Sequence, residues 1–85
     1  MINITIYAYL NNVWVKQSNF TRPLQGEDKL DETLDSAITD FTLQEKDLLP
    51  PFTEYKIVAV DKDGNTKTMY FVVATPSGEQ ARMGG

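Results

Sequence analysis

The sequence contains no cysteine and no histidine. It therefore cannot form a disulfide bond or a thiolate metal site, and it lacks the commonest general base and the thiol nucleophile of enzymes. No apolar run approaches the roughly 20 residues of a membrane-spanning helix, and the first residues lack the basic start and apolar core of a signal peptide. We therefore expect a protein that is not an enzyme, with no catalytic residue, cofactor, bound metal or membrane partner.

Basic residues are also scarce, with 8 Lys and Arg against 12 Asp and Glu and a net charge of −4. Five of the acids lie between Glu27 and Asp35, where Lys29 is the single base, so this block alone accounts for the net charge. The chain has no basic stripe for phosphates, which argues against nucleic acid as a partner. The acidic block is typical of a solvated turn; a site for a cation or a basic partner is the alternative interpretation.

The length and composition fit one small globular domain. The chain has 85 residues, of which 41% are hydrophobic and nine are aromatic (four Tyr, four Phe and one Trp). That is enough apolar material for a core in a single domain. We assign residues 1–75 to this domain and expect residues 76–85, which are small, polar and end in glycine, to form a flexible tail.

The first third of the chain predicts a β-hairpin. Apolar and polar residues alternate over residues 2–10, which is the pattern of a strand. Asn11 and Asn12 follow, and asparagine tolerates the positive φ that a two-residue hairpin turn requires. This turn would pair Leu10 with Val13, Tyr9 with Trp14, Ala8 with Val15 and Tyr7 with Lys16.

The middle of the chain is harder to assign. Residues 17–29 have no period and contain Pro23 and Gly26, so they read as an irregular link with at most a short edge strand at Phe20. Residues 34–43 alternate as a strand would, although Leu30, Leu34, Ile38 and Phe41 also fit helical spacing. The threonines at positions 33, 39 and 42 favour the strand.

The last third predicts a second hairpin. Residues 44–49 read as a single helical turn or a loop, and Pro50-Pro51 as an extended corner. Residues 55–61 predict a strand, and the apolar run from Ile57 to Val60 within them is typical of a strand buried on both faces. Asp63-Gly64-Asn65 supplies the reversal, and residues 66–74 return as a strand. The fold expected is all-β, with about five mostly antiparallel strands in a partial barrel or small sandwich.

Three aromatic residues form the candidate site. Tyr7, Tyr9 and Trp14 fall on the second face of the first hairpin, opposite its isoleucines. They could pack inside a closed barrel, anchor a protein interface, or bind a sugar or a base. Catalysis by the acidic block is not expected, because a catalytic carboxylate pair needs a protected cleft. The run from Asp61 to Asn65 does not have the spacing of a calcium-binding EF-hand loop.

Four short motifs follow the opening hairpin in a fixed order. Leu34-Asp35-Ser36-Ala37 is followed by Phe41-Thr42-Leu43, by Leu49-Pro50-Pro51-Phe52 and by Tyr70 to Val73. This succession, over about residues 30–74, resembles the N-terminal domain of tail-hub (baseplate) proteins from phages and prophages of Gram-positive bacteria. None of the motifs is catalytic.

The resemblance implies a structural role in a virion. Such a segment belongs to a β-barrel domain that helps to build a ring at the tail tip through protein–protein contacts. The implied partners are other tail or baseplate proteins and copies of the chain itself, in the virion tail or in the bacterial cytoplasm during assembly. The family's chains are much longer, so the 85 residues would be an N-terminal fragment. The alternatives are an immunoglobulin-like or carbohydrate-binding surface module and the non-catalytic front part of a tail-associated peptidase.

Overall fold

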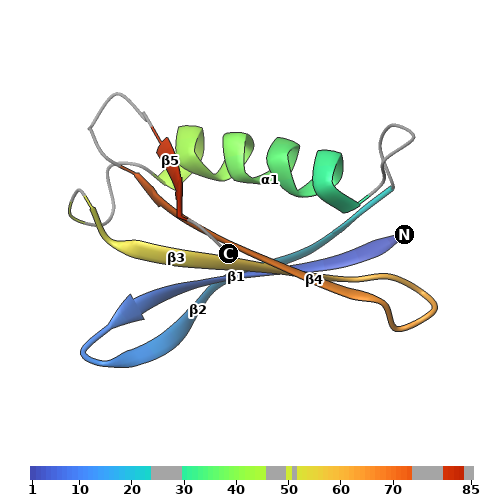
Figure 1. The fold of residues 1–85 in the computed structure, drawn as a ribbon, viewed down its shortest axis with the longest axis horizontal. Coiled ribbons are helices and arrows are strands. Elements are labelled where there is room, and N and C mark those ends of the chain that lie inside the picture. Colours follow the sequence, from blue (N-terminus) through green and yellow to red (C-terminus); the bar gives the residue numbers. More distant parts are fainter. Residues whose placement is uncertain (24–29, 46–49, 51, 74–79, 84–85) are drawn as a thin grey trace.

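In the part of the chain that the structure describes, a five-stranded antiparallel sheet carries one helix on one of its faces (Figure 1). The computed structural model describes residues 1–23, 30–45, 50, 52–73 and 80–83, with 45 and 80–83 described by their backbone alone. The elements are β1 (Ile2–Leu10), β2 (Val13–Arg22), α1 (Leu30–Glu45), β3 (Glu54–Val60), β4 (Thr66–Val73) and β5 (Gln80–Met83). The strand order is β2-β1-β3-β4-β5. β1 therefore lies between β2 and β3, which run parallel to each other on its two sides.

The first hairpin has the predicted register. Asn11 and Asn12 have φ values of 51° and 68°, as the two central residues of a type I′ turn require. All four expected pairs, from Leu10 with Val13 to Tyr7 with Lys16, are present. The turn and the alternation of faces therefore agree, which is why the register could be predicted.

A bulge extends this hairpin beyond the predicted pairs. Lys16 pairs with Tyr7 but Ser18 pairs with Ile6, so Gln17 is an extra residue in β2. The irregular link predicted from residue 17 is wrong up to Arg22, because β2 continues to that residue. The edge strand expected at Phe20 is confirmed, since β2 forms one edge of the sheet. Residues 24–29 lie outside the described residues.

The strand predicted over residues 34–43 is wrong, because α1 occupies residues 30–45. In a strand, Leu34 and Ile38 would share one face and Phe41 the other, whereas helical spacing gathers all three on one side. The threonines lower helix propensity by at most about 0.7 kcal/mol each, while burying a large apolar side chain gains about 1.5–3 kcal/mol. Burial against the sheet therefore outweighs the local preference.

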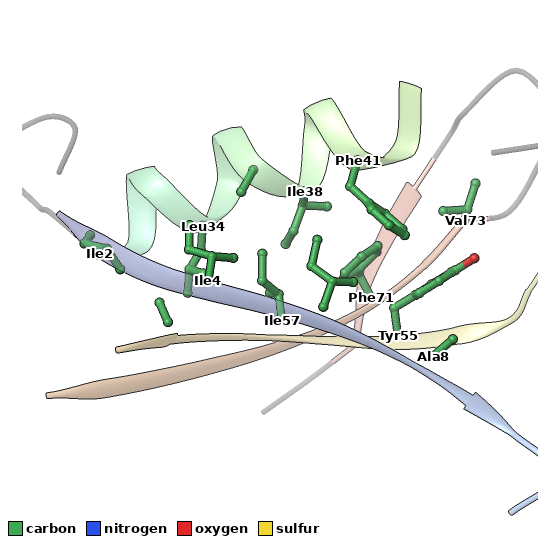
Figure 2. Close-up of a cluster of buried hydrophobic side chains, with 13 residues drawn as sticks. Ile2, Ile4, Ala8, Leu34, Ile38, Phe41, Tyr55, Ile57, Phe71 and Val73 are labelled. Atoms are coloured by element: carbon green, nitrogen blue, oxygen red, sulfur yellow. The ribbon is translucent and has the colours of Figure 1, made fainter. Parts of the chain in front are cut away.

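The helix and the sheet enclose one hydrophobic core (Figure 2). Its members are Ile2, Ile4, Ile6 and Ala8 of β1, Leu34, Ala37, Ile38 and Phe41 of α1, Tyr55, Ile57 and Ala59 of β3, and Phe71 and Val73 of β4. Tyr55 and Phe71 stack with their ring centroids 5.1 Å apart, and Phe41 meets both rings edge-on. The predicted mostly β domain of about five antiparallel strands is confirmed. Its second layer is the helix, where a barrel wall or second sheet was expected.

The second hairpin also matches its prediction, with two differences. β3 and β4 are joined through a turn in which Gly64 has a φ of 85°. β3 is buried only on its helix-facing side, because Lys56, Val58 and Val60 on the other side are half-buried. Within the tail expected at residues 76–85, Gln80–Met83 form β5 and pair with β4. Residues 46–49, 51, 74–79 and 84–85 lie outside the described residues.

Candidate functional site

The sheet face opposite the helix carries a cluster of aromatic side chains. Tyr7 and Tyr9 come from β1, Trp14 from β2 and Tyr70 from β4. The ring of Trp14 lies 4.9 Å from that of Tyr9 and 6.1 Å from that of Tyr70, measured between centroids. The three residues that the sequence singled out therefore lie together, and Tyr70 joins them. We call these four residues, with Lys56, the aromatic patch.

Lys56 lies among these rings. Its ammonium nitrogen is 4.7 Å from the ring centroid of Trp14 and 5.1 Å from that of Tyr7. A cation over an aromatic face gains about 0.5–1 kcal/mol at an exposed site. Lys56 also pairs across the sheet with Tyr7 on one side and Tyr70 on the other. The lysine thus links rings from three neighbouring strands and places one positive charge within the patch.

The local sequence brings Trp14 of β2 close to Tyr70 of β4, although two strands lie between them. The turn-proximal half of the first hairpin bends away from the helix, as Figure 1 shows at the end of β1 and the start of β2. A β-bulge bends its strand and increases the local twist, and the bulge at Gln17 separates the bent half from the flat half. The bend therefore turns Trp14 toward the open face of the central strands.

The patch is exposed enough to meet a partner. Tyr9 is 39% and Tyr70 36% exposed, while Tyr7 and Trp14 are half-buried. No described helix or strand covers this face. Among the described elements, the side chains therefore do not line the interior of a closed barrel, which was one interpretation of the sequence. The remaining two, a protein interface and a ligand site, both require an accessible surface.

On β1 and β2, the other half of the same face is polar and forms its own hydrogen bonds. The Asn19 amide nitrogen donates to the side-chain oxygens of Asn3 and Thr5, at 3.2 and 2.8 Å, and to the carbonyl of Ile4 at 3.2 Å. Thr21 continues this polar half at the next outward-facing position of β2. Along β1 and β2 the open face therefore divides into an aromatic end and a polar end, while Val58 and Val60 of β3 lie half-buried beside the polar end.

Sequence reasoning missed Tyr70 and Lys56. The sequence signal that could have found them is the turn of the second hairpin. Pairing residues 60 and 66 across this turn places Lys56 opposite Tyr70, and the pairing of β3 with β1 then places Lys56 beside Tyr7. That step needed the order of the central strands, with β3 beside β1, and the order was not predicted. The patch contains residues of four strands, whereas the predicted site contained residues of the first hairpin alone.

The described part of the acidic block has structural roles. Asp31 and Glu32 lie in the first turn of α1, where the helix dipole favours negative charge. Asp31 also forms a 3.4 Å ion pair with Lys67 of β4. Within the described ranges, no three His, Cys, Asp or Glu side chains are placed to hold a metal ion. Glu27 and Asp28 lie outside those ranges.

The acidic turn after β3 has a hydrogen-bonding role. The Asp61 carboxylate accepts hydrogen bonds from the backbone N–H groups of Asp63 and Asn65, at 2.9 and 2.8 Å, and from the Asn65 side-chain amide at 2.9 Å. The side-chain amide of Asn65 is the largest cause of a lowered pKa for Asp61, and the backbone donors lower the pKa further. The carboxylate therefore stabilises the hairpin turn that the sequence predicted at Asp63-Gly64-Asn65.

Comparisons with known proteins do not place the chain in a family: no family model, curated protein or solved structure matches it. Among the described residues, no helix combines the length and the apolar character needed to cross a membrane.

Proposed function

We propose that this chain is a non-catalytic protein-binding module whose contact surface is the aromatic patch. One observation carries the proposal. Aromatic side chains from three strands gather at one end of a sheet face that no described element covers. Tyrosine and tryptophan are the residues most enriched at the energetic centres of protein interfaces.

The patch has the chemistry of an interface centre. Rigid aromatic rings give a large contact area at a low cost in conformational entropy. Each Tyr hydroxyl can donate or accept a hydrogen bond at the rim. Lys56 adds a positive charge that favours an acidic or carbonyl-rich partner segment. The polar cluster around Asn19 then bounds the patch on β1 and β2.

We propose a phage tail or baseplate hub as the setting, with other tail proteins as partners, in the virion tail or in the bacterial cytoplasm during assembly. The support for this setting is the resemblance of the short motifs between Leu34 and Val73. The barrel that the resemblance implies differs from the open sheet and helix of this chain. The geometry of the patch supports the binding surface, and the short sequence motifs support the tail setting. The binding surface and the setting are therefore tested separately.

The test of the binding role uses purified tail and baseplate proteins encoded beside the gene for this chain. Biolayer interferometry would measure their binding to the wild type, to Trp14→Ala and to Tyr9→Ala. We expect each substitution to weaken binding at least about tenfold, because aromatic residues at interface centres have costs of this size. Thr68→Ala is the matched control, since it lies on the same face but outside the patch.

Binding that neither aromatic substitution weakens would contradict the assigned surface. No binding to any of these proteins would contradict the tail setting. A carbohydrate-binding module is the competing function for an exposed aromatic cluster. The fluorescence of Trp14 would change during titration with glycans only in that case.

A further inference from the structure

The outer edge of β2 is open. β2 pairs with β1 alone, so one side of its backbone has no strand partner among the described elements. In an antiparallel ladder, the residues that hydrogen-bond to a given neighbour alternate along the strand. The two-residue turn makes Leu10 and Val13 a hydrogen-bonded pair, so the even-numbered residues of β1 face β2. Asn19 and Thr21, which pair with odd-numbered residues of β1, therefore direct their backbone N–H and C=O groups outward.

The usable part of this edge is short and has a defined centre. The bulge at Gln17 interrupts the strand on one side, and Pro23 follows on the other, where it offers no backbone donor. Five regular residues remain, from Ser18 to Arg22. Phe20 is the middle one, and its side chain lies half-buried on the helix-facing side against the core.

A cavity of about 310 Å³ lies beside these five residues, between β2 and the helix. Its walls are Ser18, Phe20 and Arg22 of β2 and Ala37, Asp40, Phe41 and Gln44 of α1. Two phenylalanines and an alanine make part of the wall apolar. Arg22 donates hydrogen bonds to Ser36 and Asp40 and is therefore fixed at one end of the segment. An incoming strand could place one large apolar side chain here while its backbone pairs with β2.

We propose that this strand is β2 of a second copy of the chain, paired antiparallel and centred on Phe20. The two five-stranded sheets then join into one continuous sheet. Phe20 of each copy lies beside Phe20 of the other, at the mouth of the other's cavity. This surface is on the opposite face from the aromatic patch, so the inference does not depend on the proposed function.

The register follows from which residues point outward. Centred on Phe20, Asn19 of one copy meets Thr21 of the other, and both carry outward backbone groups. Ser18 then meets Arg22, so no like charges face each other, and the central aromatic pair is favourable across strands. A centre at Asn19 would place the bulge residue Gln17 in the ladder. A centre at Thr21 would place Pro23 opposite Asn19 and remove a donor.

The second copy is favoured over an unrelated peptide because β2 itself has the pattern that the edge requires. The incoming strand needs a large apolar side chain between two polar residues on the helix-facing side, and Ser18, Phe20 and Arg22 provide this order. The other edge strand, β5, has four residues, against the five regular residues of β2 from Ser18 to Arg22. Each copy carries a net charge of −4, so added salt is expected to strengthen the pairing.

The first experiment measures self-association of the full chain. Light scattering and sedimentation equilibrium would cover about 10 μM to about 1 mM, since a short strand contact gives a weak dimer. Amide hydrogen exchange by NMR would be followed over the same range. We expect a dimer in which the amides of Asn19 and Thr21 gain protection as concentration rises. The Trp14 amide, on the same edge beyond the bulge, should not change.

Two variants test the contact by different means. Phe20→Ala removes the central ring, and Thr21→Pro removes one outward N–H without touching a bond to β1. Each should raise the dimer dissociation constant at least about tenfold. Trp14→Ala, on the opposite face, should leave it unchanged. Protection of the β3 amides would show that each variant is folded.

A chain that stays monomeric to about 1 mM would overturn the proposal. So would a dimer that both variants leave intact, or one whose newly protected amides lie outside Ser18 to Arg22. Uptake of a strand only from an added peptide of another protein would assign the edge to that partner and refute self-pairing.

Discussion

Replacing two isomeric side chains of α1 with alanine tests the helix and the face it buries. Ile38 is 0% exposed in the core and Leu43 is 60% exposed. Both substitutions remove three carbons, so the environment is the main difference between them. Deleting a fully buried isoleucine side chain costs about 2–5 kcal/mol, through lost burial and the cavity left behind. An exposed leucine typically changes stability by less than about 0.5 kcal/mol.

The size of the domain makes this difference easy to measure. At about 0.05–0.15 kcal/mol per residue, 85 residues give a total stability of about 4–13 kcal/mol. Ile38→Ala would therefore remove a large part of that free energy. In a domain of 60–100 residues, 1 kcal/mol corresponds to about 4–8 °C in Tm. We expect Ile38→Ala to lower the Tm by at least about 8 °C, and Leu43→Ala to change it by less than about 4 °C.

The assays are thermal unfolding, which gives the Tm, and urea unfolding of both variants, each followed by the fluorescence of Trp14 and by circular dichroism at helix wavelengths. A strand over residues 34–43 with its face of Ala37, Thr39, Phe41 and Leu43 buried would give the opposite ranking. If Leu43→Ala is as destabilising as Ile38→Ala, the helix-on-sheet arrangement is wrong. Equal slopes of free energy against urea in both variants would show that each still unfolds as the wild type does.

Three further substitutions probe single interactions. Arg22→Lys should cost about 1 kcal/mol in urea unfolding, because a lysine cannot donate to Asp40 and Ser36 with the same fork geometry; no loss would show that the pair is solvent-screened. Gly64→Ala should also cost about 1 kcal/mol, since its φ is 85° although the space for a Cβ is open. Asp61→Asn should lower the Tm at neutral pH. The lowered pKa of Asp61 means that its carboxylate stabilises the fold above its unfolded pKa of about 3.9 and loses this effect as pH falls through the folded pKa. The Tm values of wild type and Asp61→Asn should therefore converge in acid, and a constant gap would contradict the role of Asp61.

Local signals predicted the parts of the fold that local chemistry determines. The turn at Asn11 and Asn12 fixes both the backbone reversal and the register of the residues beside it, so the pairing of Tyr9 with Trp14 followed from the sequence. The turn around Gly64 likewise predicted the reversal between β3 and β4, although no register was assigned to that hairpin from the sequence. In both hairpins, the interacting residues are close together in the chain.

The elements that depend on distant contacts were not predictable in the same way. The apolar residues of 34–43 fit both the period of a strand and that of a helix. The helix forms because it packs Leu34, Ile38 and Phe41 together against the sheet. No glycine marks the bulge at Gln17 in the sequence. The pairing of β1 with β3 joins residues about 50 positions apart, so no local signal predicts it. The sequence thus identified three of the five residues of the aromatic patch, namely Tyr7, Tyr9 and Trp14. Lys56 and Tyr70 come from the other hairpin.

A single inserted residue, Gln17, determines the geometry of both the aromatic patch and the open edge of β2. Because side chains in a strand alternate with a period of two, the extra residue Gln17 shifts every residue after it to the opposite face. Without that shift, Phe20 would lie on the open face among the polar residues, and Asn19 would point at the isoleucines of the core. The same bulge separates the bent half of the hairpin, which brings Trp14 to Tyr70, from the flat half that leaves a pairing edge. The bulge therefore allows one strand of ten residues to contribute a large aromatic residue to each face of the sheet.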